Sequence, residues 1–449
     1  MKVVHIPFCF HPDPVGGTEV YVESLARETQ ARGLAVVVAA PGSQSCRYEH
    51  RGLEVRRFAV PDRIDDLREL YGEGDAAAAR ELGKILDDEC PDIVHLHAFT
   101  RGVSLRLMRE AKARGIGVVF TYHTPTVSCQ RGTLLRWGRD VCDGTLDRAA
   151  CSECTLHGLG LAKIVSRMGG RIPPAVGHAL GRAGASGGGW TALRMTALVE
   201  HRHAAVRALL EEVDEIVALC QWVHDLLVRN GVPARKIHLS RHGVPLPRPS
   251  KAEPLPDSRP TRLRVAFLGR LDRTKGPDIL IRAVGALPGL PVEADLYGVA
   301  QSGTGDGYVR ELRRLAQGDS RIRLLPPIPH DRLGMVLSAY DFVAVPSRWL
   351  ETGPLVVLEA FAAGVPIIGS RLGGIAELVR DGMDGILIEA DSVGAWSATL
   401  QRFCDDRGLV EHLRRSIRHP RTMDDVADDM VALYHRLLAR QNVERCTAG

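Results

Sequence analysis

The sequence has no apolar stretch long enough to cross a membrane, and it has too few cysteines for a disulfide scaffold. No uncharged apolar run reaches the roughly 18 residues of a membrane-spanning helix, and no signal-peptide cleavage pattern follows the opening Met1–Ile6. Ten cysteines among 449 residues are too sparse to hold a small secreted domain together. These absences predict a cytoplasmic protein whose cysteines are thiols or metal ligands.

The sequence also lacks a strong excess of charge of either sign. Its 58 lysines and arginines nearly balance its 54 aspartates and glutamates, and a net charge of +4 is too small to indicate nucleic-acid binding. Neither a Walker A phosphate loop nor a G-x-G-x-x-G dinucleotide fingerprint is present. The composition is that of a globular protein, 45% hydrophobic and 25% charged. A chain of this length predicts two or three domains.

The start of the chain follows the order of a parallel α/β sheet. An apolar run at Val3–Phe8 leads into a loop with two glycines, an amphipathic stretch at 18–32 and a second apolar run at Val36–Ala40. This order predicts strand, loop, helix and strand. Further buried strands are predicted at 93–96, 118–122 and 215–219.

The second half of the chain repeats this arrangement after a proline-rich segment. Six prolines in the sixteen residues 245–260 exclude a helix or a central strand and favour an extended connector. A strand at 265–268, a loop and a helix from Asp278 follow. We therefore predict an N-terminal domain at 1–244, a linker at 245–260, a C-terminal domain at 261–421 and a closing amphipathic helix at 422–440.

The densest chemical signal is the segment Pro346–Pro366, which contains two glutamates in the pattern E-x7-E. Apolar residues before it predict a buried strand at 342–345, and Pro354 suits the first turn of a helix because it has no N–H to satisfy. Glu351 then lies in the loop and Glu359 on the helix. The helix rises by on the order of 8 Å from Pro354 to Glu359, so the two carboxylates can bracket a diphosphate flanked by two sugars at the helix start. Alternatively, they are two exposed glutamates beside a strand.

With Gly373–Glu377 (GGIAE) and Asp381–Gly385 (DGMDG), this glutamate pair resembles the donor-site signature of the retaining family-four glycosyltransferases. The resemblance spans nearly the whole chain. It implies the α/β fold called GT-B, in which two Rossmann-like domains face a deep cleft and the C-terminal helix packs back on the N-terminal domain. It also implies that a sugar is transferred from a nucleotide diphosphate sugar, in most relatives a UDP-sugar, with retention at the anomeric carbon.

The resemblance assigns roles to residues of the C-terminal half. Glu351 is expected to contact the transferred sugar and Glu359 the nucleotide ribose. Arg270 and Lys275 are expected to clamp the diphosphate, and two fixed cations stabilise the departing phosphate without a catalytic metal ion. Alternatively, they are solvated cations in a turn. The residues expected to bind the donor are Gly16, Gly17, Gly269, Arg270, Lys275, Glu351, Thr352, Gly353, Pro354, Leu355 and Glu359.

In the N-terminal half the resemblance singles out a glycine pair and a histidine. Gly16 and Gly17 lie between a strand and a helix, where the lack of side chains lets backbone amides approach an anion. Glu19 follows at the helix start and is a candidate for contact with the acceptor. His123 follows a predicted strand at the carboxyl edge of the sheet, where ligands of α/β proteins bind. The family has a histidine there that contacts the donor sugar, so His123 joins Glu351, Arg270 and Lys275 as a catalytic candidate; alternatively, it is structural.

Four cysteines form the pattern C-x12-C-x8-C-x2-C, namely Cys129, Cys142, Cys151 and Cys154. A C-x2-C pair turns two thiolates toward one point, and two further thiolates would complete the tetrahedral shell of a structural zinc ion. An iron–sulfur cluster, unligated thiols or a redox pair are the alternatives. A similar cysteine context occurs in a subset of related glycosyltransferases, which suggests a structural clip on the acceptor side.

A basic insert follows the cysteines. Residues 155–207 contain seven lysines and arginines and a single acid, Glu200. Such a segment can rest on an anionic membrane or receive an acidic acceptor. It therefore predicts peripheral association with the cytoplasmic face of a membrane. Alternatively, it is an exposed arginine-rich face.

The combined interpretation is a retaining glycosyltransferase that acts on a glycan, a lipid-linked glycan or another small acceptor molecule. No carboxylate of the N-terminal half stands out as a nucleophile, which agrees with the family's front-face proposal. Rival interpretations are a nucleotide-sugar epimerase on the same fold and a zinc-dependent interaction or nucleic-acid-binding protein. The chain departs from the family pattern at 220–222 (CQW), at 242–243 (HG) and at 297–300 (YGVA), where many relatives have other residues.

Overall fold

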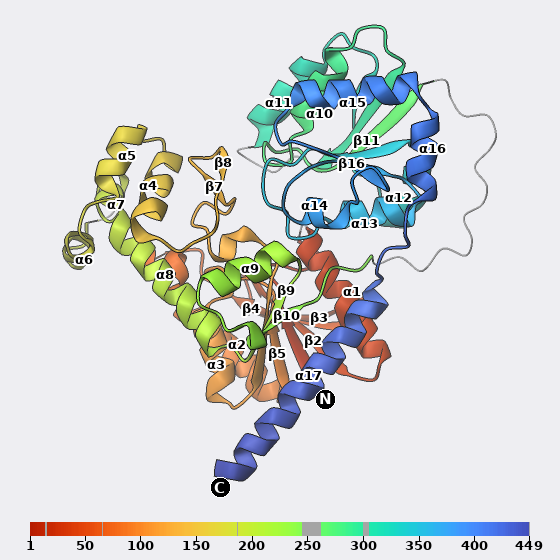
Figure 1. Cartoon of the computed structure of the whole chain (residues 1–449). Coiled ribbons are helices and arrows are strands. Elements are labelled where there is room, and N and C mark those ends of the chain that lie inside the picture. Colours follow the sequence, from red (N-terminus) through yellow and green to blue (C-terminus); the bar gives the residue numbers. More distant parts are fainter. Residues whose placement is uncertain (14–15, 65, 186, 245–261, 300–304, 449) are drawn as a thin grey trace. The chain divides into compact units, whose positions relative to one another are not determined.

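The computed structural model describes residues 1–13, 16–64, 66–185, 187–244, 262–299 and 305–448 (Figure 1). Contacts divide the chain into two compact units. The first comprises Met1–Arg241 with Met423–Gly449, and the second comprises His242–Thr422. Residues 242–244 are thus grouped with the second unit, whereas the sequence analysis assigned them to the first. The predicted linker at 245–260 lies outside the described residues.

The first unit is built on a mainly parallel sheet. Its described strands lie in the order β10-β9-β6-β5-β1-β2-β4-β3, and among them only β3 runs antiparallel to its neighbour. A separate antiparallel pair is formed by β7 and β8. The strands of this unit are β1 (Lys2–Ile6), β2 (Ala35–Gly42), β3 (Cys46–His50), β4 (Leu53–Ala59), β5 (Ile93–Leu96), β6 (Gly117–Tyr122), β7 (Leu135–Arg136), β8 (Asp140–Val141), β9 (Glu215–Ala218) and β10 (Ile237–Leu239).

The helices of the first unit connect these strands and cover the sheet. They are α1 (Gly17–Ala31), α2 (Ala76–Glu89), α3 (Leu105–Ala113), α4 (Arg148–Gly158), α5 (Lys163–Gly169), α6 (Pro174–Arg182), α7 (Gly188–Leu193), α8 (Met195–Glu212), α9 (Gln221–Arg229) and α17 (Met423–Ala448). Short helical turns occur at η1 (Glu69–Glu73), η2 (Pro125–Val127) and η3 (Ala234–Lys236). None of the described helices combines the length and hydropathy that a membrane span requires.

The closing helix α17 packs on the N-terminal sheet, as the resemblance implied. Its apolar residues recur every three or four positions, which places them on one face of a helix. Buried on that face are Met423, Val426, Ala427, Met430, Leu433, Tyr434 and Leu437, which share one core with residues of α1, β1 and β2. A contiguous stripe of this kind holds the end of the chain on the first unit through the hydrophobic effect.

The second unit repeats the α/β design with a fully parallel sheet. Its described strands lie in the order β13-β12-β11-β14-β15-β16. They are β11 (Leu263–Arg270), β12 (Val292–Val299), β13 (Ile322–Leu325), β14 (Phe342–Val345), β15 (Ile367–Ser370) and β16 (Gly385–Ile388). The helices are α10 (Pro277–Gly285), α11 (Gly305–Ala316), α12 (Leu333–Ser338), α13 (Leu355–Ala362), α14 (Gly373–Leu378), α15 (Val393–Asp405) and α16 (Gly408–Arg415), and η4 spans His330–Arg332.

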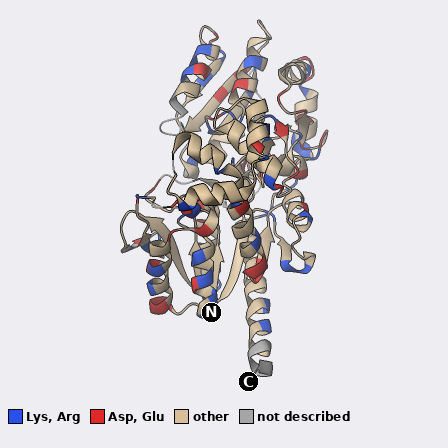
Figure 2. Cartoon of the chain, turned by 90° about the vertical axis from the view of Figure 1, so that its left-hand side faces the viewer, with Lys and Arg blue, Asp and Glu red and all other residues tan. Residues whose placement is uncertain are grey.

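The predicted strands are confirmed, because long buried apolar runs flanked by glycine or proline have few alternatives in a parallel sheet. The segments 93–96 and 342–345 form β5 and β14 with the predicted bounds, and 118–122, 215–219 and 265–268 correspond to β6, β9 and β11 within two residues. Figure 2 shows positively and negatively charged residues interspersed over much of the face in view, in keeping with the small net charge.

The basic insert forms a helical arm of the first unit. Helices α4, α6 and α7 pack on the long helix α8, and α5 packs on α4. In Figure 1 these helices stand at the end of α8 that lies away from the sheet. The sequence analysis assigned no helix to this insert, whereas the structure is helical over most of 163–212. Short helices between glycines escaped notice because their periodic pattern spans fewer than three turns.

Candidate functional site

Glu351 of the second unit is a buried carboxylate that accepts three hydrogen bonds at one oxygen. Its Oε1 lies 2.7 Å from Lys275 Nζ, 2.7 Å from Ser347 Oγ and 2.8 Å from Trp349 Nε1. Burial by itself raises the pKa of Glu351, but the Lys275 charge and these hydrogen bonds outweigh it and hold that pKa below its ordinary value. Glu351 is therefore an ionised acceptor in a fixed orientation, although only 6% of it is exposed.

Two loops must approach closely for Lys275 to reach Glu351, and Gly276 makes that approach sterically feasible. Gly276 has a φ of +68°, and a Cβ atom there would lie 2.1 Å from the carbonyl oxygen of Pro346. The backbone N–H of Arg348 donates to the carbonyl of Thr274 at 2.7 Å, which ties the loops together. A side chain at position 276 would have to push them apart.

A pair of glycines, Gly373 and Gly374, also packs against the backbone of Glu351. Gly374 donates its backbone N–H to the Glu351 carbonyl at 2.7 Å. A Cβ atom would lie 2.9 Å from that carbonyl oxygen at Gly373 and 2.8 Å from it at Gly374. The GGIAE motif therefore lets the start of α14 pack directly on the backbone of the Glu351 loop.

An arginine that the sequence analysis left without a role braces the same loop. Arg348 makes two hydrogen bonds to the buried Asp278, at 2.7 and 2.8 Å, and one to Asp391 at 2.7 Å. Tyr308 also donates its hydroxyl to Asp278. Burial alone raises the pKa of Asp278, but Arg348 and Tyr308 hold it below its ordinary value. A single arginine thus connects α10 with the Glu351 loop.

Glu359 lies on α13 in a more apolar setting than Glu351. Burial raises its pKa to about 7. His330 lies beside it, with Nδ1 4.0 Å from Glu359 Oε1. The sequence analysis placed Pro354 in the first turn of the helix. In the structure Pro354 is instead the N-cap residue, and α13 begins at Leu355. Both glutamates nevertheless occupy the predicted loop and helix.

Arg270 and Gly269 close β11, whose neighbour in the sheet, β14, leads into the Glu351 loop. The Arg270 side chain is 43% exposed and its Nε lies 3.4 Å from Asp272 Oδ2. A half-exposed cation of this kind has a solvated head that can turn toward an anion. Its role as part of a diphosphate clamp stays a prediction.

His242, one of the departures from the family pattern, lies against the Glu351 loop at Gly353. A Cβ atom at Gly353, whose φ is +148°, would lie 2.8 Å from His242 Cδ2. Burial lowers the pKa of His242 to about 4, so its ring is neutral near pH 7. Sequence reasoning gave this histidine no role. The available signal in the sequence was that His242 stands where many relatives have another residue.

In the first unit, the predicted glycine pair forms the start of α1. Gly17 is its first residue, and the backbone N–H of Gly16 donates to Glu19 Oε2 at 2.8 Å. The Glu19 carboxylate, 5% exposed, thereby caps the helix in the way typical of acids in a first turn. Its contact with an acceptor stays a prediction.

His123 directly follows β6, as predicted, and is 5% exposed. Its Nε2 lies 3.0 Å from Nδ1 of His97, a residue of the loop after β5. The rings of His123 and Tyr21 meet edge to face with centroids 4.9 Å apart. The sequence analysis found no support for His97, because a neighbour on an adjacent strand carries no signature in the linear sequence.

The structure brings the four predicted cysteines to one cavity of about 280 Å³, which is lined by Cys129, Cys142, Cys151 and Cys154. None of the described cysteines forms a disulfide. The backbone N–H of Trp137 donates to Cys154 Sγ at 3.4 Å, and burial with neighbouring sulfurs raises the pKa of Cys151 to about 12. Among the described residues, the groups whose ligand atoms all lie within 4.8 Å of one another contain histidines and a glutamate and not these cysteines.

One such group is His11, Glu23 and His50. The His11 and His50 rings are stacked, with centroids 4.1 Å apart and planes 10° from parallel. Lone pairs of stacked imidazoles point side by side and do not converge on one ion. Glu23 instead accepts a hydrogen bond from His11 Nε2 at 3.0 Å and pairs with Arg51 at 3.2 Å. This arrangement favours an ion-paired cluster and not a metal centre.

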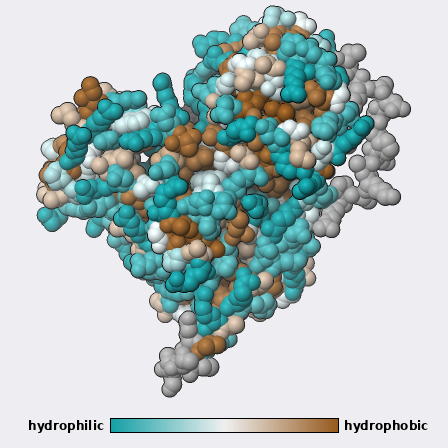
Figure 3. All heavy atoms as spheres, in the orientation of Figure 1, coloured by the Kyte–Doolittle hydropathy of each residue, from teal (hydrophilic) through white to brown (hydrophobic). Residues whose placement is uncertain are grey.

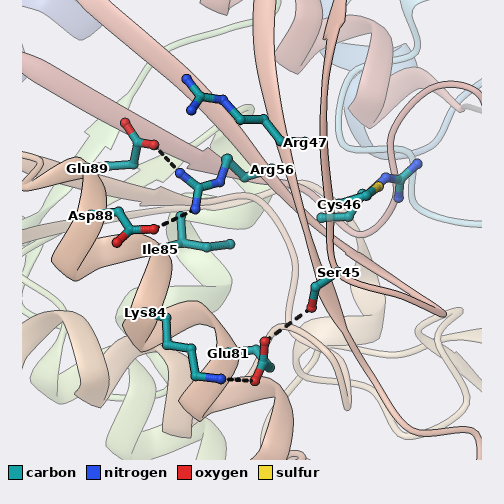
Figure 4. A pocket seen from close by; sticks show the side chains of 10 residues that line it. Ser45, Cys46, Arg47, Arg56, Glu81, Lys84, Ile85, Asp88 and Glu89 are labelled. Atoms are coloured by element: carbon teal, nitrogen blue, oxygen red, sulfur yellow. Dashed lines mark hydrogen bonds and ion pairs between the residues drawn. The ribbon is translucent and has the colours of Figure 1, made fainter.

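A larger surface cavity of about 620 Å³ lies between α2, β3 and β4, away from every predicted site residue (Figure 4). Arg56 pairs with Asp88 and Glu89, and Lys84 pairs with Glu81. The charges drawn in Figure 4 thus largely neutralise one another, which leaves little net attraction for a charged ligand.

Comparison with known families decides the family of the chain. Residues 16–243 match the glycosyl transferase 4-like domain, and residues 254–419 match glycosyl transferases group 1. The chain belongs to the glycosyltransferases. Curated relatives include the D-inositol 3-phosphate glycosyltransferases of Mycobacterium tuberculosis and Mycobacterium bovis, each 36% identical over 195 residues. That match covers 41% of this chain and 39% of each relative, so the chain spans about two fifths of the length of these relatives.

Solved structures confirm the GT-B fold of this glycosyltransferase. Sucrose-phosphate synthase from Thermosynechococcus elongatus has a TM-score of 0.66 at 18% identity and covers 98% of this chain and 100% of its own. HepE from Anabaena, in complex with UDP and glucose, has a TM-score of 0.62 at 15% identity over 96% and 99% of the two chains. WaaG, involved in lipopolysaccharide biosynthesis, has a TM-score of 0.61 at 17% identity over 95% and 98%.

Proposed function

We propose that this glycosyltransferase transfers a sugar from a UDP-sugar to a glycan, a lipid-linked glycan or a small-molecule acceptor, with retention at the anomeric carbon. The observation that carries the proposal is the buried, ionised Glu351, which is held by Lys275 at 2.7 Å in a loop that leads into α13. A carboxylate acceptor beside a cation and a helix start suits a hydroxyl-rich sugar linked to a diphosphate. The UDP complexes of HepE support the choice of nucleotide.

The residues of the second unit then have different roles in binding the donor and in stabilising the leaving group. Glu351 accepts hydrogen bonds from the sugar hydroxyls, and Glu359 accepts them from the ribose. Lys275 and Arg270 stabilise the negative charge that develops on the departing diphosphate. In the front-face step, the bond between the anomeric carbon and the phosphate oxygen breaks while the acceptor oxygen attacks the same face. The acceptor proton passes to the leaving phosphate, so the step consumes no other base.

A donor-binding experiment tests this function before the acceptor is known. Thermal unfolding is measured with UDP, UDP-sugars and other nucleotides, since a ligand at 100 times its Kd stabilises a native protein by about 2.7 kcal/mol. We expect a shift with UDP-sugars that is lost in Glu351→Ala and kept in Glu389→Gln, a control at an exposed glutamate of the same unit. A protein that ignores every nucleotide sugar would contradict the proposal.

The products of the reaction then separate the rival functions. With donor and acceptor, nuclear magnetic resonance of the anomeric proton must show the same configuration in product and donor. With donor alone, an isomerised nucleotide sugar would instead indicate an epimerase. Salt-sensitive binding of DNA or RNA that survives Glu351→Ala, without nucleotide-sugar binding, would indicate a nucleic-acid protein.

We also propose that Cys129, Cys142, Cys151 and Cys154 hold a structural zinc ion. The chemistry of the donor set supports this, because four thiols from two loops and from α4 line one cavity, although their sulfurs do not all lie within 4.8 Å of one another. Thiolate sulfur is a preferred zinc ligand, and a backbone N–H such as that of Trp137 is a typical second partner of such a sulfur. Zinc would join the loop after β6 to α4.

Elemental analysis of the purified full chain tests the zinc proposal. We expect about one zinc per chain, lost in Cys151→Ser and retained in the control Cys404→Ser, which alters a half-buried cysteine of α15. Iron with sulfide would support a cluster instead. Absence of any metal from protein purified without chelators would contradict both and leave free thiols.

We further propose that the helical arm rests on an anionic membrane. Large apolar side chains are exposed at Leu159, Ile164, Val165, Met168, Val176, Trp190 and Leu193, and Figure 3 shows hydrophobic atoms at the outer end of this arm. Residues 155–199 carry five lysines and arginines and no acid. Exposed apolar side chains beside cations complement an acidic lipid surface. This contact also suits a lipid-linked acceptor.

Vesicle flotation tests the membrane contact with a matched pair of methionines. Met168 on the arm is 69% exposed, and Met335 on α12 is 72% exposed. We expect binding to vesicles with acidic lipid, weaker binding to neutral vesicles, and a loss of binding in Met168→Ser that Met335→Ser does not share. Equal behaviour of the two variants would contradict the assignment of the arm.

A further inference from the structure

Three histidines on neighbouring strands form a continuous hydrogen-bonded chain that ends at His123. His5 lies on β1, His97 follows β5 and His123 follows β6, and these strands are adjacent in the sheet. His5 Nδ1 lies 3.0 Å from His97 Nε2, and His97 Nδ1 lies 3.0 Å from His123 Nε2. Both ring nitrogens of His97 are therefore used within the chain.

The inner part of this chain is uncharged. His5 and His97 are 0% and 1% exposed. Burial lowers the pKa of His5 to about 3 and lowers the pKa of His97 well below its ordinary value, because no carboxylate compensates an imidazolium there. The rings of His95 and His97 are tilted by 31° with centroids 4.1 Å apart, and His95 makes hydrogen bonds with Thr121 and with Tyr434 of α17, each at 2.7 Å. His95 thus fixes the ring of His97 without joining the chain.

Proton counting couples the three rings. A neutral imidazole carries one N–H and one bare nitrogen. Each of the two hydrogen bonds needs one proton between its two nitrogens. When His97 donates from Nδ1, His123 is bare at Nε2, and His97 accepts at Nε2 from His5 Nδ1. When His97 donates from Nε2, His5 is bare at Nδ1 and His123 donates from Nε2 to Nδ1 of His97. With His123 neutral as well, all three rings carry the proton on the same type of nitrogen.

The far end of the chain prevents a change between these two states. Reversal would require a proton to enter or leave at His5 Nε2, and that atom is buried and has no hydrogen-bond partner among the described residues. Charge separation within the chain is opposed by burial. Because no proton can pass through His5, the three hydrogen-bonded histidines hold one tautomer and do not conduct protons.

We propose that His5 and His97 are positioning residues that lock His123 in one neutral tautomer. This proposal rests on the proposed function, because the family resemblance gives His123 a contact with the transferred sugar. The remaining nitrogen of His123, Nδ1, then has a constant character, either donor or acceptor, toward whatever group it meets. A fixed tautomer removes the reorganisation that a rotating or exchanging imidazole would need during transfer.

Nitrogen NMR of the histidine rings tests the lock in the free protein, without donor or acceptor. With ¹⁵N-histidine in the full chain, we expect one protonated-type and one bare-type signal for each of His5, His97 and His123, on the same nitrogen in all three. In His97→Asn the amide offers both a donor and an acceptor to His123. We therefore expect the two resolved His123 signals to collapse to averaged ones.

The controls separate the lock from general damage to the fold. Tyr434→Phe removes a hydroxyl that bonds to His95 and leaves the chain intact, so we expect unchanged His123 signals. His5→Asn serves if His97→Asn does not fold, and it should also release the lock. Different tautomers among the three rings, or His123 signals unchanged in both asparagine variants, would overturn the proposal. A protein with the locked signature that binds no nucleotide sugar would instead contradict the proposed function.

Discussion

Replacing Gly276 by alanine should disable the proposed donor site while leaving most of the protein unchanged. The added Cβ would lie 2.1 Å from the Pro346 carbonyl oxygen, whereas such contacts are normally at least about 3 Å. The two loops must therefore move apart by about 1 Å. Because Lys275 and Glu351 lie 2.7 Å apart, this displacement breaks their hydrogen bond and misaligns both groups.

Two effects of different size follow. The left-handed φ of +68° costs alanine roughly 1–2 kcal/mol, and the steric clash adds to it, so the unfolding temperature should fall by several degrees. A misplacement of about 1 Å at a catalytic group reduces turnover by on the order of 100-fold. The loss of activity should thus exceed what the modest loss of stability explains.

The assay compares Gly276→Ala with Gly285→Ala, at the other end of the same helix α10. A Cβ atom added at Gly285 would meet no other atom within 4 Å, and Gly285 does not have a positive φ. Release of UDP from a UDP-sugar and thermal unfolding are measured for both variants. If Gly276→Ala retains turnover within about twofold of Gly285→Ala, the idea that loop contact positions Lys275 and Glu351 is refuted.

Three further outcomes follow from the same unit. Because the pKa of Glu359 is raised to about 7, UDP affinity should rise with pH until about pH 7.5 and then level off, and titration calorimetry of Glu359→Gln should show no such rise. The same raised pKa means that stability from the protonated carboxyl is complete below about pH 4.5 and is lost as pH rises through 7. Urea unfolding should therefore show a decline of up to about 3 kcal/mol over that window, absent in Glu359→Gln. Arg348→Met should strand the buried Asp278 carboxylate and lower the free energy of unfolding by on the order of 3 kcal/mol in urea, and an unchanged midpoint would refute the brace.

Much of the fold was predictable because its signals are local. Buried parallel strands such as 93–96 and 342–345 are apolar throughout, and the two α/β halves repeat one order of elements. The arm was not predictable in detail, because helices of six to nine residues between glycines have too short a pattern. Its exposed apolar side chains became visible only when the packing of α4 to α8 separated the covered from the uncovered faces.

The site divides in the same way. The sequence by itself determined the chemistry present, since the E-x7-E pair, Lys275 and the glycines beside them can be read from spacing and from a family resemblance. Only the tertiary structure decided which of these groups touch. Ser347, Trp349 and Gly374 make hydrogen bonds to Glu351. The hydrogen bonds from His5 through His97 to His123 connect separate strands. Spacing along the sequence determines which residues of one helix or strand lie on the same face. Contacts between strands and loops depend instead on how the sheet brings distant residues together.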